Sequence, residues 1–228
     1  MIFPDRGELT SPTYGTIEKD VIYIYIKYRG RIMTIIESSY FWQGTKIRLR
    51  ATQRSDWEQW KLESTDSEAI RLMEWGIELP KNDIDVAEVS DKYDNFKDNY
   101  RKMFAIEALS NNQLVGLINL NSLDHKNGVF SFGLGVHRGY RNNGYASEAT
   151  RIIMRYGFYE LRMQKCNSSC VEINEASLKF HKNLGFIEEG RRRRIIYMGG
   201  KFYDNILLGI TREEFDEIES KYSKIKHQ

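Results

Sequence analysis

Cysteine is scarce in this sequence, which has only Cys166 and Cys170 among its 228 residues. They lie four residues apart on a predicted strand, so they share a face but are too far apart for a disulfide. No cluster of histidines accompanies them, and we therefore predict no metal site. The interpretation we favour is a pair of buried thiols in a reducing compartment.

Long hydrophobic runs are also missing from the sequence. No segment has the unbroken apolar run of a membrane span, and the amino terminus has no basic region followed by an apolar one. We therefore expect a cytoplasmic protein with no membrane partner.

A strong charge imbalance is the third absence, because the net charge is only +2. Such a balance predicts no general attraction to polyanions. Binding of nucleic acid would depend on the four arginines at 191–194, but along a strand they point alternately to opposite faces and form no single patch. The sequence thus argues against a nucleic-acid partner.

The sequence does contain enough apolar material for a core, with 41% hydrophobic and 13% aromatic residues. At this length we expect one core domain, residues 44–228, preceded by an extension, residues 1–43. Residues 1–20 look irregular, whereas residues 21–27 and 31–36 carry β-prone side chains on either side of a short turn. This β-hairpin requires a partner edge from the same subunit or a neighbour, so we expect that it could support a homo-oligomer.

The core domain is predicted to be mixed α/β, with a mainly antiparallel twisted sheet flanked by helices. The expected strands are 44–50, 103–109, 114–123, 129–136, 166–173, 186–197 and 201–210, and the expected helices lie within 56–98, after a loop ending near 145, at 174–184 and from about 211. No internal repeat or low-complexity segment interrupts them.

Acidic side chains outnumber basic ones in residues 56–98. Such a region would attract a cationic amine, but solvated helix faces are the interpretation we favour. For Trp57, Trp60 and Trp75 we likewise favour packing between helix and sheet over a role as a substrate wall.

Residues 131–156 contain a strand, a tight polar loop and a helix. This order predicts an anion site, because the first backbone N–H groups of a helix have no internal partner and lie at the positive end of its dipole. Gly139 and Gly144 would let the backbone approach a phosphate closely. The loop is not of the Walker type, and Arg138 stands where a dinucleotide fingerprint needs its third glycine.

The string Arg-Asn-Asn-Gly-Tyr-Ala in this loop resembles the R/Q-x-x-G-x-G/A pyrophosphate loop of the GNAT acetyltransferases. Its Gly-Tyr-Ala-x-Glu-Ala continuation is typical of the branch that includes ribosomal-protein N-terminal acetyltransferases and spermidine acetyltransferases. The resemblance implies acetyl-CoA as co-substrate, with contacts from Val136, Arg141, Asn142, Asn143, Gly144, Tyr145 and Ala146.

A second polar group, Asn174, Ser177 and His181, has the spacing i, i+3, i+7 and so forms one stripe on a helix. Asn174 is a natural N-cap and Gly185 a natural helix stop. The segment from Asn174 to Phe186 resembles the N-x-x-S-x-x-x-Y-x-x-x-G-F segment of GNAT enzymes. This resemblance places Asn174 and Ser177 among the contacts to the pantetheine arm.

Two positions depart from the family pattern. His181 stands where the family has the tyrosine that protonates the departing thiolate. An imidazolium with a pKa near 6.5 can protonate the thiolate of a thiol with a pKa of about 8.5, so we expect His181 to be the general acid, with a packing or capping histidine as the alternative. Ser131 stands where many relatives have a glutamate, so no carboxylate can be named as the base.

The resemblance implies an N-acetyltransferase, in which a primary amine attacks the thioester directly and backbone N–H groups near Val136 stabilise the oxyanion. The acceptor would be a protein N-terminus, a polyamine or another small amine. An α-amine with a pKa near 8 is partly neutral at pH 7, whereas a lysine-like amine with a pKa near 10.4 needs a base or a water relay. The alternative is a catalytically weak acyl-CoA-binding or regulatory module.

Overall fold

The computed structural model describes residues 15–18, 21–28, 31–38, 40–63, 65–77, 79 and 101–226. The chain divides into two compact units, Met1–Gly44 and Thr45–Gln228. No helix within the described ranges is both long and apolar enough to cross a membrane.

The amino-terminal unit contains a small antiparallel sheet in the order β1-β2-β3, formed by Gly15–Glu18, Val21–Tyr28 and Arg31–Ser38. β2 and β3 pair along their whole length, which confirms the predicted hairpin. The prediction of irregular structure up to residue 20 is wrong for β1, which pairs with β2. β1 therefore covers one of the two edges that the hairpin would otherwise leave unpaired.

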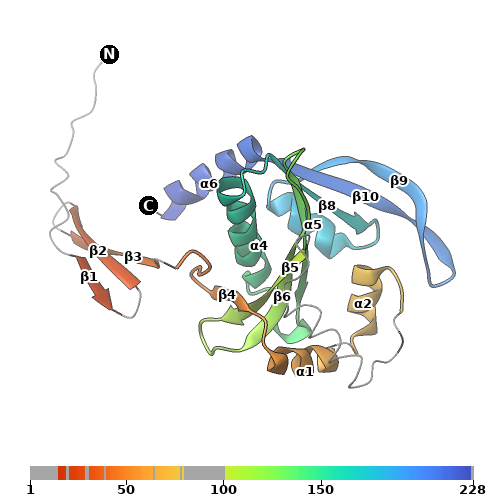
Figure 1. Cartoon of the computed structure of the whole chain (residues 1–228), viewed down its shortest axis with the longest axis horizontal. Helices are drawn as coiled ribbons and strands as arrows, with labels where there is room; N and C mark the ends of the chain where they lie inside the picture. The colour runs from red at the N-terminus through yellow and green to blue at the C-terminus, as the bar shows by residue number, and fades with distance from the viewer. Residues whose placement is uncertain are drawn as a thin grey trace, which may run out of the picture. The chain divides into compact units, whose positions relative to one another are not determined.

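The larger unit is organised around a seven-stranded sheet in the order β4-β5-β6-β7-β8-β10-β9 (Figure 1). All neighbours in it are antiparallel except β7 and β8, which are parallel. The strands are β4 Ile47–Ala51, β5 Arg101–Ala108, β6 Leu114–Asp124, β7 Val129–Val136, β8 Lys165–Val171, β9 Ile187–Met198 and β10 Lys201–Thr211. The predicted mixed α/β fold is thus confirmed.

Helices cover both faces of this sheet, with α1 and α2 lying apart from α4, α5 and α6 (Figure 1). The helices are α1 Arg54–Glu63, α2 Ser67–Glu74, α4 Tyr145–Arg155, α5 Glu175–Asn183 and α6 Arg212–Lys226, with a 3₁₀ turn η1 Arg138–Tyr140 and a π-helical turn η2 Tyr156–Glu160. Phe130 and Phe132 of β7 point to one face, where they contact Phe158 of η2 and His181 of α5. The alternate residues of β7 share the other face of the sheet, on which Trp57 of α1 packs against Leu117, the partner of Gly135.

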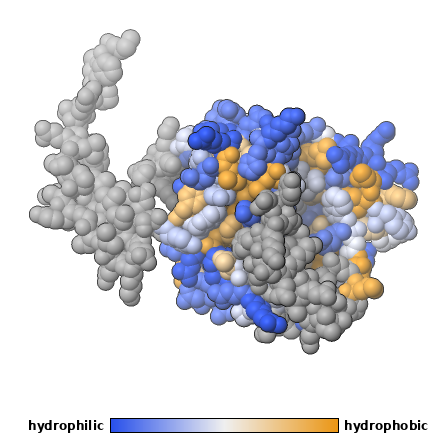
Figure 2. Space-filling view, viewed as in Figure 1, coloured by the Kyte–Doolittle hydropathy of each residue, from blue (hydrophilic) through white to orange (hydrophobic). Residues whose placement is uncertain are grey.

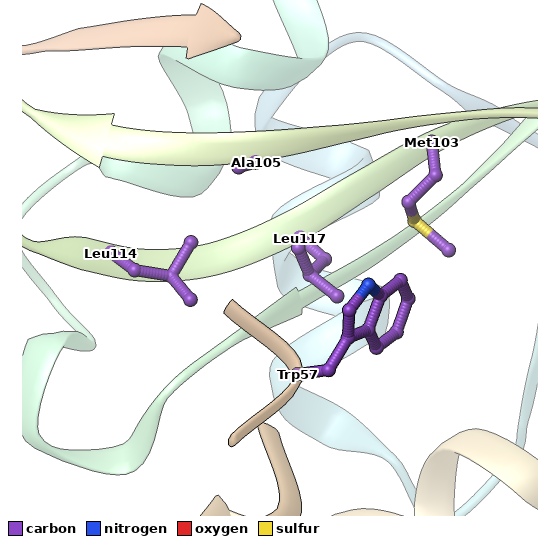
Figure 3. Packing of buried hydrophobic residues seen from close by; sticks show 5 residues of the cluster. All are labelled: Trp57, Met103, Ala105, Leu114 and Leu117. Carbon is purple, nitrogen blue, oxygen red and sulfur yellow. The ribbon is translucent and has the colours of Figure 1, made fainter. Parts of the chain in front are cut away.

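Trp57 attaches α1 to the face of the sheet opposite to Phe130 and Phe132. It is buried together with Met103, Ala105, Leu114 and Leu117, and Figure 3 shows its indole ring beside the strands that carry them. Packing, the interpretation we favoured for this residue, is therefore its role.

The other two tryptophans of the region give different results. Trp75 ends α2 in the left-handed conformation and remains 38% exposed. We expected it to pack between helix and sheet, and that expectation is wrong for this residue. The side chain of Trp60 lies outside the described part of the chain. The helical interpretation of residues 56–98 is confirmed through α2, while residues 80–100 are not described.

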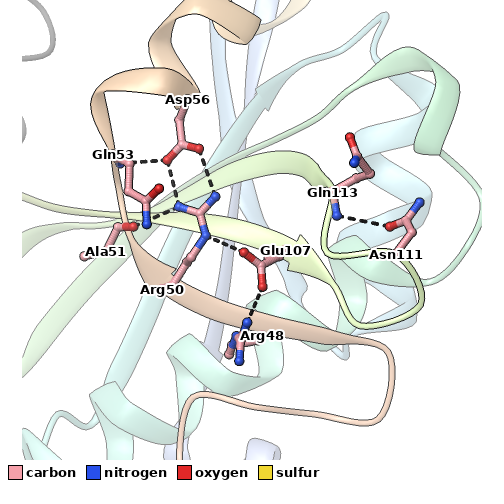
Figure 4. Close-up of polar contacts among 8 residues, drawn as sticks. All are labelled: Arg48, Arg50, Ala51, Gln53, Asp56, Glu107, Asn111 and Gln113. Atoms are coloured by element: carbon pink, nitrogen blue, oxygen red, sulfur yellow. Dashed lines mark hydrogen bonds and ion pairs between the residues drawn. The ribbon is translucent and has the colours of Figure 1, made fainter.

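An ion network joins β4 to α1 (Figure 4). Arg50 donates to both carboxylate oxygens of Asp56, at 2.8 and 2.9 Å, and to Glu107 at 2.6 Å; Glu107 also accepts from Arg48. Burial acts to raise the pKa of Glu107, but the two arginines outweigh it and the pKa is lowered. These contacts hold the start of α1 against the sheet.

The cysteines of β8 behave as predicted. Cys166 and Cys170 are free, buried thiols, and burial raises the pKa of both, which makes them unreactive.

On the face of the molecule seen in Figure 2, hydrophilic residues cover much of the described surface and hydrophobic patches lie between them.

Candidate active site

The loop between β7 and α4 is held in shape by its own polar groups. The Asn143 side chain donates to the carbonyls of Tyr140 and Arg141, at 3.1 and 3.2 Å. Asn142 and Gly144 are both left-handed, with φ of 65° and 82°, and Gly144 is the residue that precedes the helix. A residue with a Cβ is strained at the Gly144 position, which explains why glycine stands there.

The amino end of α4 is open. Within the described chain no side chain caps it, and residues 141–144 are exposed. Its first N–H groups, which include those of Tyr145 and Ala146, therefore remain available to an anion at the positive end of the helix dipole.

Arg141 does not extend from the loop. Its Nε donates to the carbonyl of Val136 at 3.1 Å, and its guanidinium lies 3.3 Å from Asp66, the N-cap of α2. Asp66 also accepts two hydrogen bonds from Arg138, and these arginines hold the pKa of Asp66 at about 2. The Arg141 side chain thus ties the loop to α2.

One residue that sequence reasoning missed comes to this loop from another segment. Lys46, the residue before β4, donates through Nζ to the carbonyl of Asn143 at 2.9 Å. A Cβ built on Gly144 would lie 3.2 Å from this ammonium. In the first turn of α4, Glu148 accepts the backbone N–H groups of Thr45, Lys46 and Ile47. A positive charge therefore lies beside the predicted phosphate loop, and no local sequence signal indicates it.

β7 and β8 separate in the middle of the sheet. They pair only from Val129↔Lys165 to Ser131↔Asn167, although β7 continues to Val136 and β8 to Val171. Beyond the last pair, the facing edges of these two strands have no ladder partner in each other. This divergence opens at the carboxyl ends of both strands, the edge at which α/β sheets bind ligands.

The second predicted group lies on α5, which follows β8. The Asn174 side chain accepts the N–H of Ser177 at 3.0 Å and so caps the helix as predicted. His181, two turns further, is only 5% exposed. The sequence prediction therefore brought these three residues correctly onto one helix face.

The His181 ring is enclosed by three aromatic rings, those of Phe132, Phe180 and Phe186. Its Nδ1 lies 2.8 Å from the carbonyl of Ser177, and its Nε2 lies 2.7 Å from the Ser168 hydroxyl. Burial lowers the pKa of His181, which favours the neutral imidazole, and the Ser177 carbonyl opposes this only in part.

Residues 46–187, more than half of the chain, match the acetyltransferase (GNAT) domain family. The chain belongs to the GNAT family. The SPbeta prophage-derived uncharacterized N-acetyltransferase YokL of Bacillus subtilis strain 168 is 37% identical to it over 177 residues, which cover 77% of this chain and 96% of the relative.

Solved structures share the fold of this GNAT chain. Spermidine N-acetyltransferase from Vibrio cholerae, in complex with CoA and spermine, has a TM-score of 0.66 and 19% identity, and the match covers 75% of this chain and 99% of that one. The RimL ribosomal L7/L12 α-N-protein acetyltransferase in complex with CoA has a TM-score of 0.65 and 17% identity, and covers 74% and 95%. The chain is an acetyl-CoA-dependent N-acetyltransferase, as the sequence motifs implied.

The residues of this GNAT enzyme fit acetyl-CoA. The open amino end of α4 suits the pyrophosphate, Lys46 adds a positive charge, and the unpaired strand edges offer amide partners along the divergence. No three potential metal ligands cluster within the described ranges.

On the α1 side of the sheet, a row of uncharged polar residues crosses the closed end of the divergence. The register aligns Asn121 with Ser131 and Ser131 with Asn167, and Asn119 lies two residues before Asn121 on the same face of β6. Asn119 accepts the N–H of Gly133 at 2.9 Å. The buried Oδ1 of Asn121 has no hydrogen-bond partner among the described residues. It is therefore an acceptor that a ligand N–H could satisfy.

Proposed function

We propose that this GNAT enzyme transfers the acetyl group of acetyl-CoA to a primary α-amine by direct attack. The loop 141–146 holds the pyrophosphate, Asn174 and Ser177 hold the pantetheine arm, and backbone N–H groups near Val136 stabilise the oxyanion. The observation that carries the proposal is the separation of β7 from β8 immediately after Ser131, with an open helix start after one strand and His181 beside the other.

We place His181 as the proton source for the departing thiolate. Its ring stacks on Phe132, the first residue of β7 beyond the last pair with β8, so it lies where the thiol would leave. A tyrosine hydroxyl is the usual donor at this position of the family motif. Imidazolium, with a reference pKa near 6.5, is a stronger acid than a tyrosine hydroxyl, whose pKa is about 10. Its pKa also lies below that of the thiol, about 8.5, so proton transfer to the thiolate is favourable.

The uncharged row favours an α-amine over a polyamine. Asn119, Asn121, Ser131 and Asn167 offer hydrogen bonds but no charge to a polycation. Three carboxylates of the α1–α2 region are paired with arginines: Asp56 with Arg50, and Asp66 and Glu68 with Arg138. An α-amine also needs less help from a base, because its pKa near 8 leaves part of it neutral at pH 7.

A thiol-release assay with acetyl-CoA and an amine panel tests the proposal. The panel contains peptides with free N-termini, spermidine and aminoglycosides, because solved relatives carry names that indicate either a polyamine or a protein α-amine. We expect the highest kcat/KM for a peptide or other α-amine. Faster turnover of spermidine would reject the acceptor class, and binding of CoA without turnover of any amine would favour the regulatory module.

Two further parts of the proposal concern the whole molecule. We propose that the amino-terminal extension, residues 1–43, serves assembly and does not touch the reacting atoms, which sedimentation and turnover of a protein lacking residues 1–40 would test. A cytoplasmic location is supported by the two free buried thiols.

A further inference from the structure

Ser168 is the first residue of β8 beyond its last pair with β7, so it borders the divergence directly. Its hydroxyl lies 2.7 Å from Nε2 of His181. Ser168 is half-buried, whereas His181 is 5% exposed behind its three aromatic neighbours. Of the two groups, the serine is the one that a molecule in the divergence can reach.

The hydrogen bonds of the ring define which nitrogen carries the proton. Nδ1 faces the backbone carbonyl of Ser177 at 2.8 Å, and a carbonyl can only accept. Nδ1 must therefore be the N–H donor, which leaves Nε2 as an acceptor in the neutral ring. The Ser168 hydroxyl, which can donate, completes the arrangement by giving its hydrogen bond to Nε2.

We infer that Ser168 exchanges protons with the reacting atoms and that His181 stores the proton between two transfers. The pair would act first as base and then as acid, an inference that rests on the proposed acetyl transfer. It supplies the base that the sequence lacks, since Ser131 replaces the carboxylate found in many relatives.

The proton and the electron pairs balance over one turnover. The amine nitrogen attacks the thioester carbon, forms the N–C bond and becomes positively charged, while the carbonyl π pair moves to oxygen. The nitrogen gives a proton to Ser168 as the serine passes its own proton to Nε2 of His181. The C=O bond then re-forms, the C–S bond breaks, and sulfur leaves with the electron pair. His181 returns the proton through Ser168 to the thiolate, so both residues end as they began.

The surroundings of the ring suit temporary storage of a proton. The groups that face it are Phe132 from β7, Ser168 from β8, and Ser177, Phe180 and Phe186 from α5 and the turn after it, none of which is charged. The titratable Cys170 is linked to it through the Ser177 hydroxyl. Burial lowers the pKa of His181, so the imidazolium would give the proton back readily.

The kinetic test compares Ser168→Ala, Ser168→Thr and the control Ser169→Ala, whose side chain lies on the opposite face of β8. We expect Ser168→Ala to lower kcat by about 10²-fold with acetyl-CoA affinity unchanged, and Ser168→Thr, which keeps the hydroxyl, to recover most of the loss. The Ser169→Ala variant should match the wild type. Equal kcat for Ser168→Ala and Ser169→Ala in a wild-type enzyme that turns over would overturn the inference and leave the proposed function intact.

A second readout needs no activity. In ¹⁵N-labelled, ligand-free protein, with the His181 signals identified by loss in His181→Gln, we expect Nδ1 to be protonated and Nε2 to be an acceptor. Ser168→Ala should shift the Nε2 resonance, while Ser169→Ala should not. A proton on Nε2 in the neutral wild-type ring would reject the inference. Failure of the wild type to bind CoA would instead reject the proposed function.

Discussion

The helices that follow the parallel strands β7 and β8 begin in opposite ways. α4 begins after a left-handed Gly144 with no side-chain cap within the described chain, and its loop is exposed. α5 begins after Asn174, whose side chain satisfies the N–H of Ser177. The first junction thus leaves backbone donors for a ligand, whereas the second uses its own side chain to satisfy a donor.

This difference separates two tasks at one edge of the sheet. The open junction suits a phosphate, which interacts with backbone N–H groups and a helix dipole. The closed junction suits side chains that must keep one orientation, because its capped helix holds His181 against β7 and β8. Changes at either junction should therefore affect different measurements.

The largest effect is expected from His181→Ala at the closed junction. Loss of the proton-transfer group should lower kcat by about 10²-fold with little change in CoA affinity, because proton transfer contributes in the transition state. His181→Tyr should recover part of the loss. If the alanine variant unfolds at a lower temperature but keeps its kcat, His181 is a packing residue.

Gly144→Val should damage the open junction. The added side chain is strained at φ 82° and blocks close approach of a phosphate, so the Kd for CoA should rise at least about tenfold, or about 1.4 kcal/mol. Gly200→Val is a matched control, because Gly200 has φ 80° and open space in the β9–β10 turn. Calorimetry that finds the same Kd in both folded variants would contradict the assignment of the loop.

Burial of His181 predicts a pH dependence of stability. Its pKa is lowered in the folded state, so below about pH 6.5 the unfolded chain binds the extra proton and the free energy of unfolding falls, by at most about 1.4 kcal/mol per pH unit. Above that pH the stability is fully present. In urea unfolding, the difference between wild type and His181→Gln should shift in favour of the variant as the pH falls. Parallel pH profiles would contradict this.

Asn174→Ala removes the cap of α5. We expect a loss of about 1 kcal/mol in the free energy of unfolding, because the first-turn donor becomes unsatisfied. Asn174→Asp should keep most of the stability, since aspartate accepts the same hydrogen bond. An equal loss in both variants would show that the cap is not what the asparagine contributes.

The smallest effect is expected from Lys46→Met. An exposed charge contributes modestly, so the Kd for CoA should rise about threefold in low salt and less in high salt. Lys201→Met, an exposed lysine of β10, should leave the Kd unchanged. Identical affinities for the two variants would remove Lys46 from the phosphate site.

Local sequence determined much of this protein. The β2–β3 hairpin, the order of strands and helices, the left-handed Gly144 and the Asn174 cap depend on residues close together in the chain, so their patterns are readable without the fold. Trp75 and β1 depart from expectation because packing and strand pairing are not local properties.

The tertiary structure alone decided which distant groups meet. Lys46 reaches Asn143 across 97 positions, Asp66 holds Arg138 and Arg141, and Ser168 lies against His181. These contacts follow from the order and register of the strands, which bring together segments that carry no mutual signal in the sequence. The position at which β7 and β8 separate is likewise decided by the tertiary structure, because it depends on the pairing of each strand with its other neighbour.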